Sequence, residues 1–212
     1  DPQSGLVLTS SCCSNTATEH AMMGRLMTDT LVRWARDYKV DGFRFDLMGL
    51  HLKADVQTAQ AALASLTPGA DGVDGSRIYL YGEGWEMGEM QNDFRGVNAN
   101  QVNMAGTGIG TFNDRIRDGL RGGGPFDAGV AIRRNQGFAS GQYVAPNELA
   151  TATAADLGHA LDLVKIGMAG GLSEFRMVPA TSATGTATYA GSIGYNGAHA
   201  GYTQDPQECV NY

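Results

Sequence analysis

The chain has 212 residues, enough for one sizeable hydrophobic core, and carries a formal net charge of −7. This negative balance, without a basic run or a basic patch interleaved with aromatic residues, argues against a nucleic-acid partner. No apolar run approaches the ~18 residues that a membrane-spanning helix needs, so we expect no membrane span.

The first predicted element is a helix over about residues 18–38, which follows a polar, loop-like stretch. Thr16 and Glu19 have the spacing of a capping box at its start. Its apolar residues recur at helical spacing and are interpreted as core packing: Met22, Met23, Leu26, Met27, Leu31, Trp34 and Ala35. In the stretch before it, Cys12 and Cys13 can form only a strained vicinal disulfide or remain thiols. With Cys209 they make no zinc-binding pattern, so the redox compartment stays open.

Three strands are predicted along the rest of the chain, over residues 38–49, 77–85 and 107–113. An Ala-rich helix over about residues 54–66 separates the first two, which is βαβ order and predicts parallel strands. Residues 86–106 are expected to form a long loop. A short helix starts at about residue 114, another helix covers about residues 152–169, and residues 172–205 are expected to form loops and a hairpin.

The first strand carries two charges on one face. Because side chains alternate along a strand, one face is expected to be apolar, with Phe43, Phe45 and Leu47. Arg44 and Asp46 are expected to point to the other face. A structural ion pair on a half-exposed strand is one interpretation. The other is a functional carboxylate that its arginine keeps ionised.

A second carboxylate, Glu83, ends the second strand between two glycines, with Trp85 two residues further on. The glycines are expected to let a ligand approach the backbone. Asp46, Glu83 and Asn113 end successive strands about one βα unit apart, at roughly 31 residues per unit in an eight-stranded barrel. In such a barrel these strand ends converge on one mouth, where active sites lie.

Two carboxylates at one mouth suit glycoside hydrolysis. Asp46 would be the nucleophile, Glu83 the general acid with a pKa raised by burial and by its anionic neighbour, and Trp85 a stacking surface for a sugar. Paired carboxylates also bind metals or stabilise folds, and Glu83 as a surface residue at a strand end is the alternative.

Several stretches resemble the pullulanase and limit-dextrinase group of the α-amylase superfamily. GFRFD at 42–46 is shared across that superfamily, whereas GEGW at 82–85 and GTGIGTFNDR at 106–115 are more specific to the debranching group. The stretch NGAHAGYTQDPQECVNY at the end of the chain also resembles the segment before that family's seventh strand. The resemblance covers essentially the whole chain.

The resemblance implies a partial (β/α)8 TIM barrel, roughly strands 4 to 6 with their helices and long βα loops, which forms the central part of one catalytic domain over residues 1–212. It implies hydrolysis of α-1,6-glucosidic branch links in pullulan, limit dextrins, starch or glycogen with retained configuration. The implied partner is an α-glucan. The implied site residues are the nucleophile Asp46, the acid/base Glu83, and the substrate-binding residues Arg44, Trp85, Asn113, Asp114 and Arg115.

By the same resemblance, no cofactor is expected to be required, and a structural calcium ion in the parent enzyme stays open. Asp114 is interpreted equally well as a helix-capping residue. Both a plastid and a secreted location fit such an enzyme.

The family's third carboxylate, an aspartate in a His-Asp motif, is expected beyond Tyr212. None of His20, His51, His159 and His199 matches the family's histidine motifs. The chain alone is therefore expected neither to fold stably nor to cleave pullulan. Two alternatives stay open. One is an isoamylase-like or other α-amylase-superfamily enzyme, and GEGW counts against the isoamylase-like debranching enzyme. The other is a catalytically incomplete carbohydrate-binding fragment.

Overall fold

A computed structural model describes residues 4–10, 13–169, 176–180, 182–185, 188–189 and 202–203 of the chain. It has two compact units, residues 1–111 and 112–212, and each is described by itself. The elements are α1 (Ala21–Tyr38), β1 (Gly42–Phe45), η1 (Met48–Leu50), α2 (Lys53–Ala64), α3 (Pro68–Asp71), η2 (Gly75–Arg77), β2 (Tyr79–Gly82), η3 (Gly88–Asp93), β3 (Gly110–Phe112), α4 (Asp114–Arg121), α5 (Val130–Arg134), η4 (Phe138–Ser140), α6 (Ala154–Met168), β4 (Arg176–Met177), β5 (Thr188–Tyr189) and β6 (Tyr202–Thr203). Within the described part of the chain, no helix is both long and apolar enough to cross a membrane.

The first unit is built on parallel strands, as the βαβ order predicted. β1 pairs with β2 so that Phe45 lies opposite Gly82, and β2 pairs with β3 so that Gly82 lies opposite Thr111. Helix α2 lies in the connection from β1 to β2, whereas the long connection from β2 to β3 contains only the short η3. Because parallel strands end at one edge of the sheet, Asp46 after β1 and Glu83 after β2 leave the sheet side by side.

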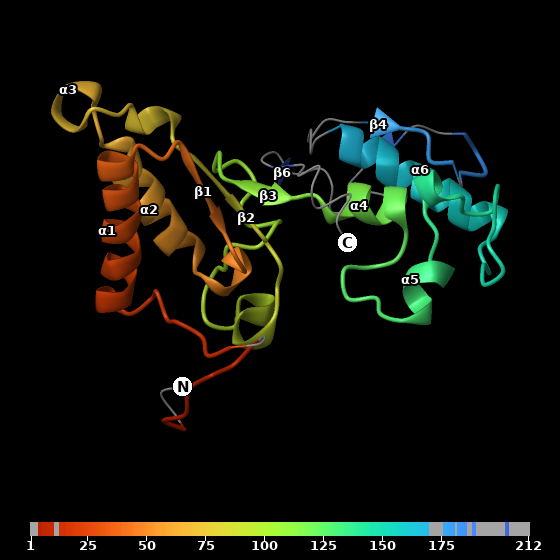
Figure 1. The fold of residues 1–212 in the computed structure, drawn as a ribbon, viewed down its shortest axis with the longest axis horizontal. Coiled ribbons are helices and arrows are strands. Elements are labelled where there is room, and N and C mark those ends of the chain that lie inside the picture. Colours follow the sequence, from red (N-terminus) through yellow and green to blue (C-terminus); the bar gives the residue numbers. More distant parts are fainter. Residues whose placement is uncertain are drawn as a thin grey trace. The chain divides into compact units, whose positions relative to one another are not determined.

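Helices α1 and α2 pack against each other next to the strands of the first unit (Figure 1). One hydrophobic cluster joins Ala35 of α1, Val56 and Leu63 of α2, and Leu80 of β2. The core interpretation of the first helix is right for Ala35 and for the partly buried Met27 and Leu31, which pack against this cluster. It is wrong for Met22, Leu26 and Trp34, whose side chains are exposed.

The start of α1 also differs from the prediction. His20 is the residue before the helix and makes no side-chain cap, so Thr16 and Glu19 form no capping box. Thr18 is buried instead, and its hydroxyl contacts His51 and Asp55. Nearby, Cys13 takes part in a disulfide, while Cys12 and Cys209 lie outside the described residues.

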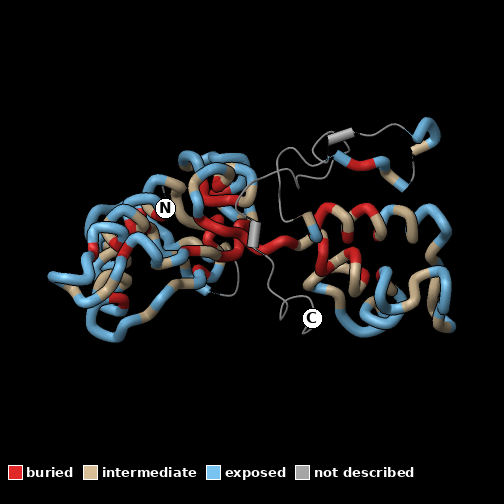
Figure 2. Tube along the Cα trace, turned by 90° about the horizontal axis from the view of Figure 1, so that it is seen from above, coloured by how far each residue is buried: buried red, intermediate tan, exposed pale blue. Residues whose placement is uncertain are grey.

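In the second unit α4 packs on α6, and both helices occur where the sequence predicted them. Thr153 and Asp156 form a capping box at the start of α6. β4 and β5 form an antiparallel pair, which agrees with the predicted hairpin, although most of residues 172–205 lies outside the described part. Figure 2 shows residues 109–113, which include β3, as one continuous buried stretch.

Candidate active site

The end of β1 presents the two charges as predicted. Phe45 is buried in the core, whereas Arg44 and Asp46 are more exposed. The strand is shorter than predicted, because it ends at Phe45 and Leu47 adopts a left-handed conformation with φ of 48°. Leu47 is therefore not part of the apolar strand face. Its turn aims its backbone N–H at Glu83.

Arg44 joins the two predicted catalytic carboxylates. Its Nη1 donates a hydrogen bond of 2.6 Å to Oδ1 of Asp46, and its Nη2 donates one of 2.8 Å to Oε1 of Glu83. One planar guanidinium with two donors in a fixed fork thus holds both carboxylates. The predicted contact between Arg44 and Asp46 is confirmed, and the contact to Glu83 shows that the pair is not an isolated surface ion pair.

The two carboxylates have different environments. The Asp46 side chain is 75% exposed, whereas that of Glu83 is 6% exposed. Burial raises the pKa of Glu83, against the opposing effects of the 2.9 Å hydrogen bond from the Leu47 N–H and of the Arg44 charge. The neighbouring Asp46 raises that pKa further. Of the two carboxyl groups, that of Glu83 thus has the environment that suits a proton donor.

The glycines around Glu83 have a different purpose from the one predicted. A Cβ on Gly82 would lie 2.5 Å from the carbonyl oxygen of Phe45, and one on Gly84 would lie 2.7 Å from the backbone nitrogen of Gln101. Neighbouring protein atoms therefore occupy the space that a ligand was expected to use. The absent side chains let the strand and loop pack closely around Glu83.

Gly49 makes a similar approach to the segment that carries Trp85. A Cβ at position 49 would lie 1.8 Å from the carbonyl oxygen of Trp85. We expect Gly49→Ala to lower the thermal denaturation midpoint of the full-length protein, because a backbone atom must move to admit the methyl group. The expected loss corresponds to about 1–3 kcal/mol in the free energy of unfolding. Gly69→Ala is the matched control, since a Cβ at position 69 would have no atom within 4 Å. Equal midpoints for the two variants would contradict the close packing.

The remaining predicted site residues belong to the second unit. Asn113 is the N-cap of α4, and its Oδ1 accepts hydrogen bonds from the backbone N–H groups of Arg115 and Ile116. The capping role considered for Asp114 is therefore wrong: Asp114 follows the cap and pairs with Arg117 at 3.2 Å. Among the described residues, the buried Nδ2 of Asn113 has no hydrogen-bond partner.

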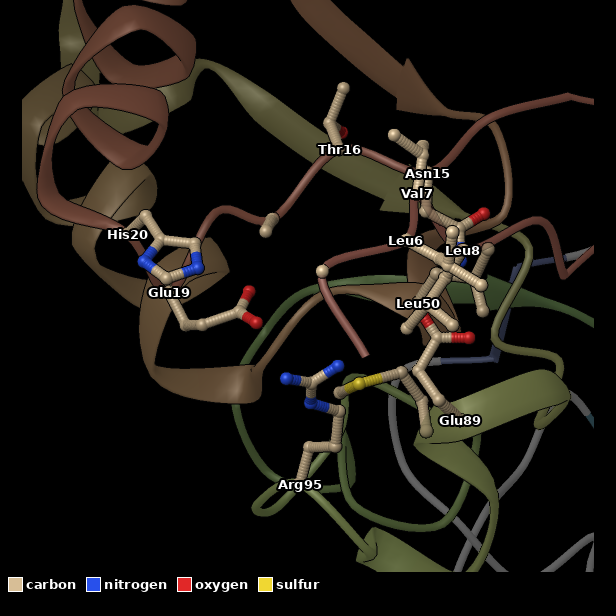
Figure 3. Close-up of a pocket in the computed structure, with 13 residues that line it drawn as sticks. Leu6, Val7, Leu8, Asn15, Thr16, Glu19, His20, Leu50, Glu89 and Arg95 are labelled. Carbon is tan, nitrogen blue, oxygen red and sulfur yellow. The ribbon is translucent and has the colours of Figure 1, made fainter. Parts of the chain in front are cut away.

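Two pockets of the first unit lie at the η1 turn, and the smaller of them also borders Asp46. A pocket of about 230 Å³ is lined by Asp46, Leu47, Leu50, His51, Glu89 and residues 13–16. A larger pocket of about 430 Å³ shares Leu50, Glu89, Asn15 and Thr16 with it. Figure 3 shows Glu19, Glu89 and Arg95 around this larger pocket, together with the apolar Leu6, Leu8 and Leu50.

Sequence reasoning missed these pocket residues because the polar stretch before the first helix indicates only a loop. Glu89 fixes that loop: its carboxylate accepts hydrogen bonds from Ser10 and from Nδ2 of Asn15. Although burial works against it, these bonds lower the pKa of Glu89. No group of three His, Cys, Asp or Glu residues suited to a metal ion occurs in the described ranges.

A parallel sheet whose carboxyl edge carries two carboxylates in unlike environments, joined by an arginine, is an arrangement suited to an α/β glycoside hydrolase. The comparisons with known proteins identify the group. The chain is 48% identical over 208 residues to a pullulanase of Klebsiella pneumoniae, and 43% identical over 213 residues to the chloroplastic pullulanase 1 of Arabidopsis thaliana. Both alignments cover 98% of this chain.

The fold agrees with these relatives. The crystal structure of Klebsiella pneumoniae pullulanase complexed with maltotriose matches 93% of this chain, with a TM-score of 0.76 and 47% identity. No family model matches the chain. The chain is a homologue of the pullulanases, and the predicted resemblance is confirmed. It spans about a fifth of the length of these relatives, 18% and 21% of the two curated proteins and 17% of the crystallised one.

Proposed function

We propose that the full-length protein containing this chain hydrolyses α-1,6-glucosidic branch links in pullulan, limit dextrins, starch or glycogen, with retention of configuration. The observation that carries the proposal is the Arg44 bridge between Asp46 and Glu83, in a chain homologous to pullulanases. A bridge by one guanidinium favours a short separation of the two carboxyl groups. A short separation suits a retaining mechanism, because an inverting enzyme needs room for a water molecule between substrate and base.

In this mechanism Asp46 is the nucleophile. Its exposed carboxylate lines the pocket and attacks the anomeric carbon, which forms a glycosyl-enzyme intermediate. Glu83 donates a proton to the leaving oxygen and then, as a base, takes a proton from the water that releases the sugar. Each Glu83 oxygen accepts one hydrogen bond in the structure and keeps a second lone pair, which can carry the proton that Glu83 donates.

The other parts of the proposal concern substrate and fold. Trp85 stacks on a glucose ring, and Asn113, Asp114 and Arg115 contact further sugars of an α-glucan. A relative crystallised as a maltotriose complex supports an oligosaccharide ligand. The parallel β1–β3 sheet supports a partial (β/α)8 barrel as the central part of one catalytic domain. The reaction needs no cofactor, and calcium, where bound, has a structural role.

The test is an assay of the full-length protein on pullulan. We expect release of reducing ends, with the α-anomer of the product appearing first by proton NMR before it mutarotates. Binding of maltosaccharides without any release of reducing ends would overturn the enzyme proposal in favour of a carbohydrate-binding protein. Initial appearance of the β-anomer would overturn the retaining mechanism.

The pH profile tests the role of Arg44. The Arg44 charge lowers the pKa of Glu83, so Arg44→Met raises it. A general acid is active in its protonated form, which is lost as pH rises through its pKa. The basic limb of the kcat/KM profile should therefore move to higher pH in Arg44→Met, while kcat falls. Arg36→Met, which removes an arginine paired with Asp37 on α1, should leave the profile unchanged. An unmoved basic limb in Arg44→Met would count against Glu83 as the general acid.

A further inference from the structure

Next to the nucleophile, a histidine is held by a short chain of hydrogen bonds. Oγ1 of Thr18 lies 3.1 Å from Nδ1 of His51 and 3.0 Å from Oδ2 of Asp55. Thr18 is buried, and the His51 ring meets Phe45 edge-on with centroids 6.0 Å apart. Thr18 and Phe45 thus contact the His51 ring, and Asp55 holds the Thr18 hydroxyl in place.

The chain of bonds also fixes which ring nitrogen carries the proton. A hydroxyl has one hydrogen, and the Asp55 carboxylate can only accept, so the Thr18 hydrogen points to Asp55. The Thr18 oxygen must then accept from His51, which places the ring hydrogen on Nδ1. Burial lowers the pKa of His51, against the opposing charges of Asp55 and Glu19, which favours the neutral ring. In that tautomer the free lone pair is on Nε2, which makes Nε2 a hydrogen-bond acceptor.

His51 and Asp46 line the same pocket of about 230 Å³. The carboxylates of Asp46 and Glu89 also line this pocket. Its hydrogen-bond acceptors therefore suit a ligand that brings several hydrogen-bond donors. A sugar does so through its hydroxyl groups, without adding a charge next to Asp46.

We propose that His51 is a substrate-binding residue whose Nε2 accepts a hydrogen bond from a hydroxyl of the glucan, and that Thr18 and Asp55 are positioning residues that hold the ring in this tautomer. This inference rests on the proposed function, because it takes the pocket beside Asp46 as part of the sugar site. It assigns a binding role to a residue that matches no family motif in the sequence. It also gives a purpose to the buried Thr18.

Paired substitutions in the full-length protein test the His51 contact. Gln places a polar group near the position of Nε2, whereas Asn places one near that of Nδ1. We expect His51→Asn to lower kcat/KM on pullulan about tenfold, mainly through KM, and His51→Gln to retain most of the wild-type value, as loss of one neutral hydrogen bond implies. Equal losses in His51→Asn and His51→Gln would overturn the proposal.

A second pair tests the positioning role without touching the ring. Thr18→Ser keeps the hydroxyl and should behave as the wild type, whereas Thr18→Val keeps the shape and should raise KM about three- to tenfold. A lower thermal midpoint for Thr18→Val with an unchanged KM would show a merely structural role and overturn this part. If both His51 variants fail to fold, the Thr18 pair decides.

A binding measurement separates this inference from the proposed function. The affinity for maltotriose is measured by calorimetry in a Glu83→Gln background, with and without His51→Asn. Weaker binding with His51→Asn supports the contact even if the wild-type protein fails to cleave pullulan. Cleavage of pullulan by the wild type, with equal maltotriose affinity and equal KM for both His51 variants, leaves the proposed function standing and overturns the His51 contact.

Discussion

Replacement of Glu83 by Gln should lower kcat on pullulan by about 10²–10⁴-fold, the range that a positioned general acid contributes. Gln keeps an oxygen that can accept the hydrogen bond from the Leu47 N–H, so the local packing should persist. It cannot donate a proton of useful acidity to a departing sugar hydroxyl. The basic limb of the pH profile should therefore disappear together with the activity.

The choice of leaving group makes this prediction specific. An α-glucoside with an acidic phenol as its leaving group needs little protonation, so the first step on that substrate should be nearly normal in Glu83→Gln. Glu86→Gln is the matched control, because Glu86 is exposed and lies three positions further along the same segment. A Glu83→Gln protein that cleaves pullulan at the rate of the Glu86→Gln protein would exclude Glu83 as the acid.

Replacement of Asp46 by Asn should lower kcat by at least about a thousandfold on every substrate, including those with acidic leaving groups, as loss of a nucleophile does. Asn retains an acceptor for Arg44, so the bridge to Glu83 can remain partly in place. Loss of the Asp46 charge also removes one of the effects that raise the pKa of Glu83. Any residual activity should therefore decline at lower pH than in the wild type.

Mass spectrometry can identify the nucleophile directly. A fluorinated α-glucosyl substrate that reacts quickly and hydrolyses slowly should add its sugar mass to the peptide that contains Asp46. Asp41→Asn, at an exposed carboxylate just before β1, should label as the wild type does. Labelling of Asp46→Asn at the wild-type rate would show that another residue attacks the sugar.

The sequence alone was sufficient to predict the framework of this site. The alternation of Phe43, Arg44 and Phe45 defined the two faces of β1, since the period of a strand is two residues. The placement of Glu83 after β2 followed from the same kind of pattern. Since parallel strands end at a common edge, the juxtaposition of Asp46 and Glu83 could be predicted without coordinates.

Features that depend on packing could not be predicted in this way. Leu47 adopts a left-handed conformation that glycine and asparagine favour and leucine rarely adopts. Tertiary contacts hold it there, so its residue type gives no indication of the turn. The purpose of Gly82 and Gly84 depends on Phe45 and Gln101, which are distant in sequence. His51 became a candidate only when folding brought Thr18 and Asp55 to it.

The Leu47 turn offers a way to observe Glu83 without turnover. The Leu47 amide hydrogen points at a buried carboxylate and can exchange with solvent deuterium only when that bond opens. Its exchange rate therefore measures how often Glu83 leaves its resting position, on a timescale that a static structure does not report. A bound saccharide that draws Glu83 toward the scissile bond should speed deuterium uptake at this one amide while it slows uptake in the surrounding loops.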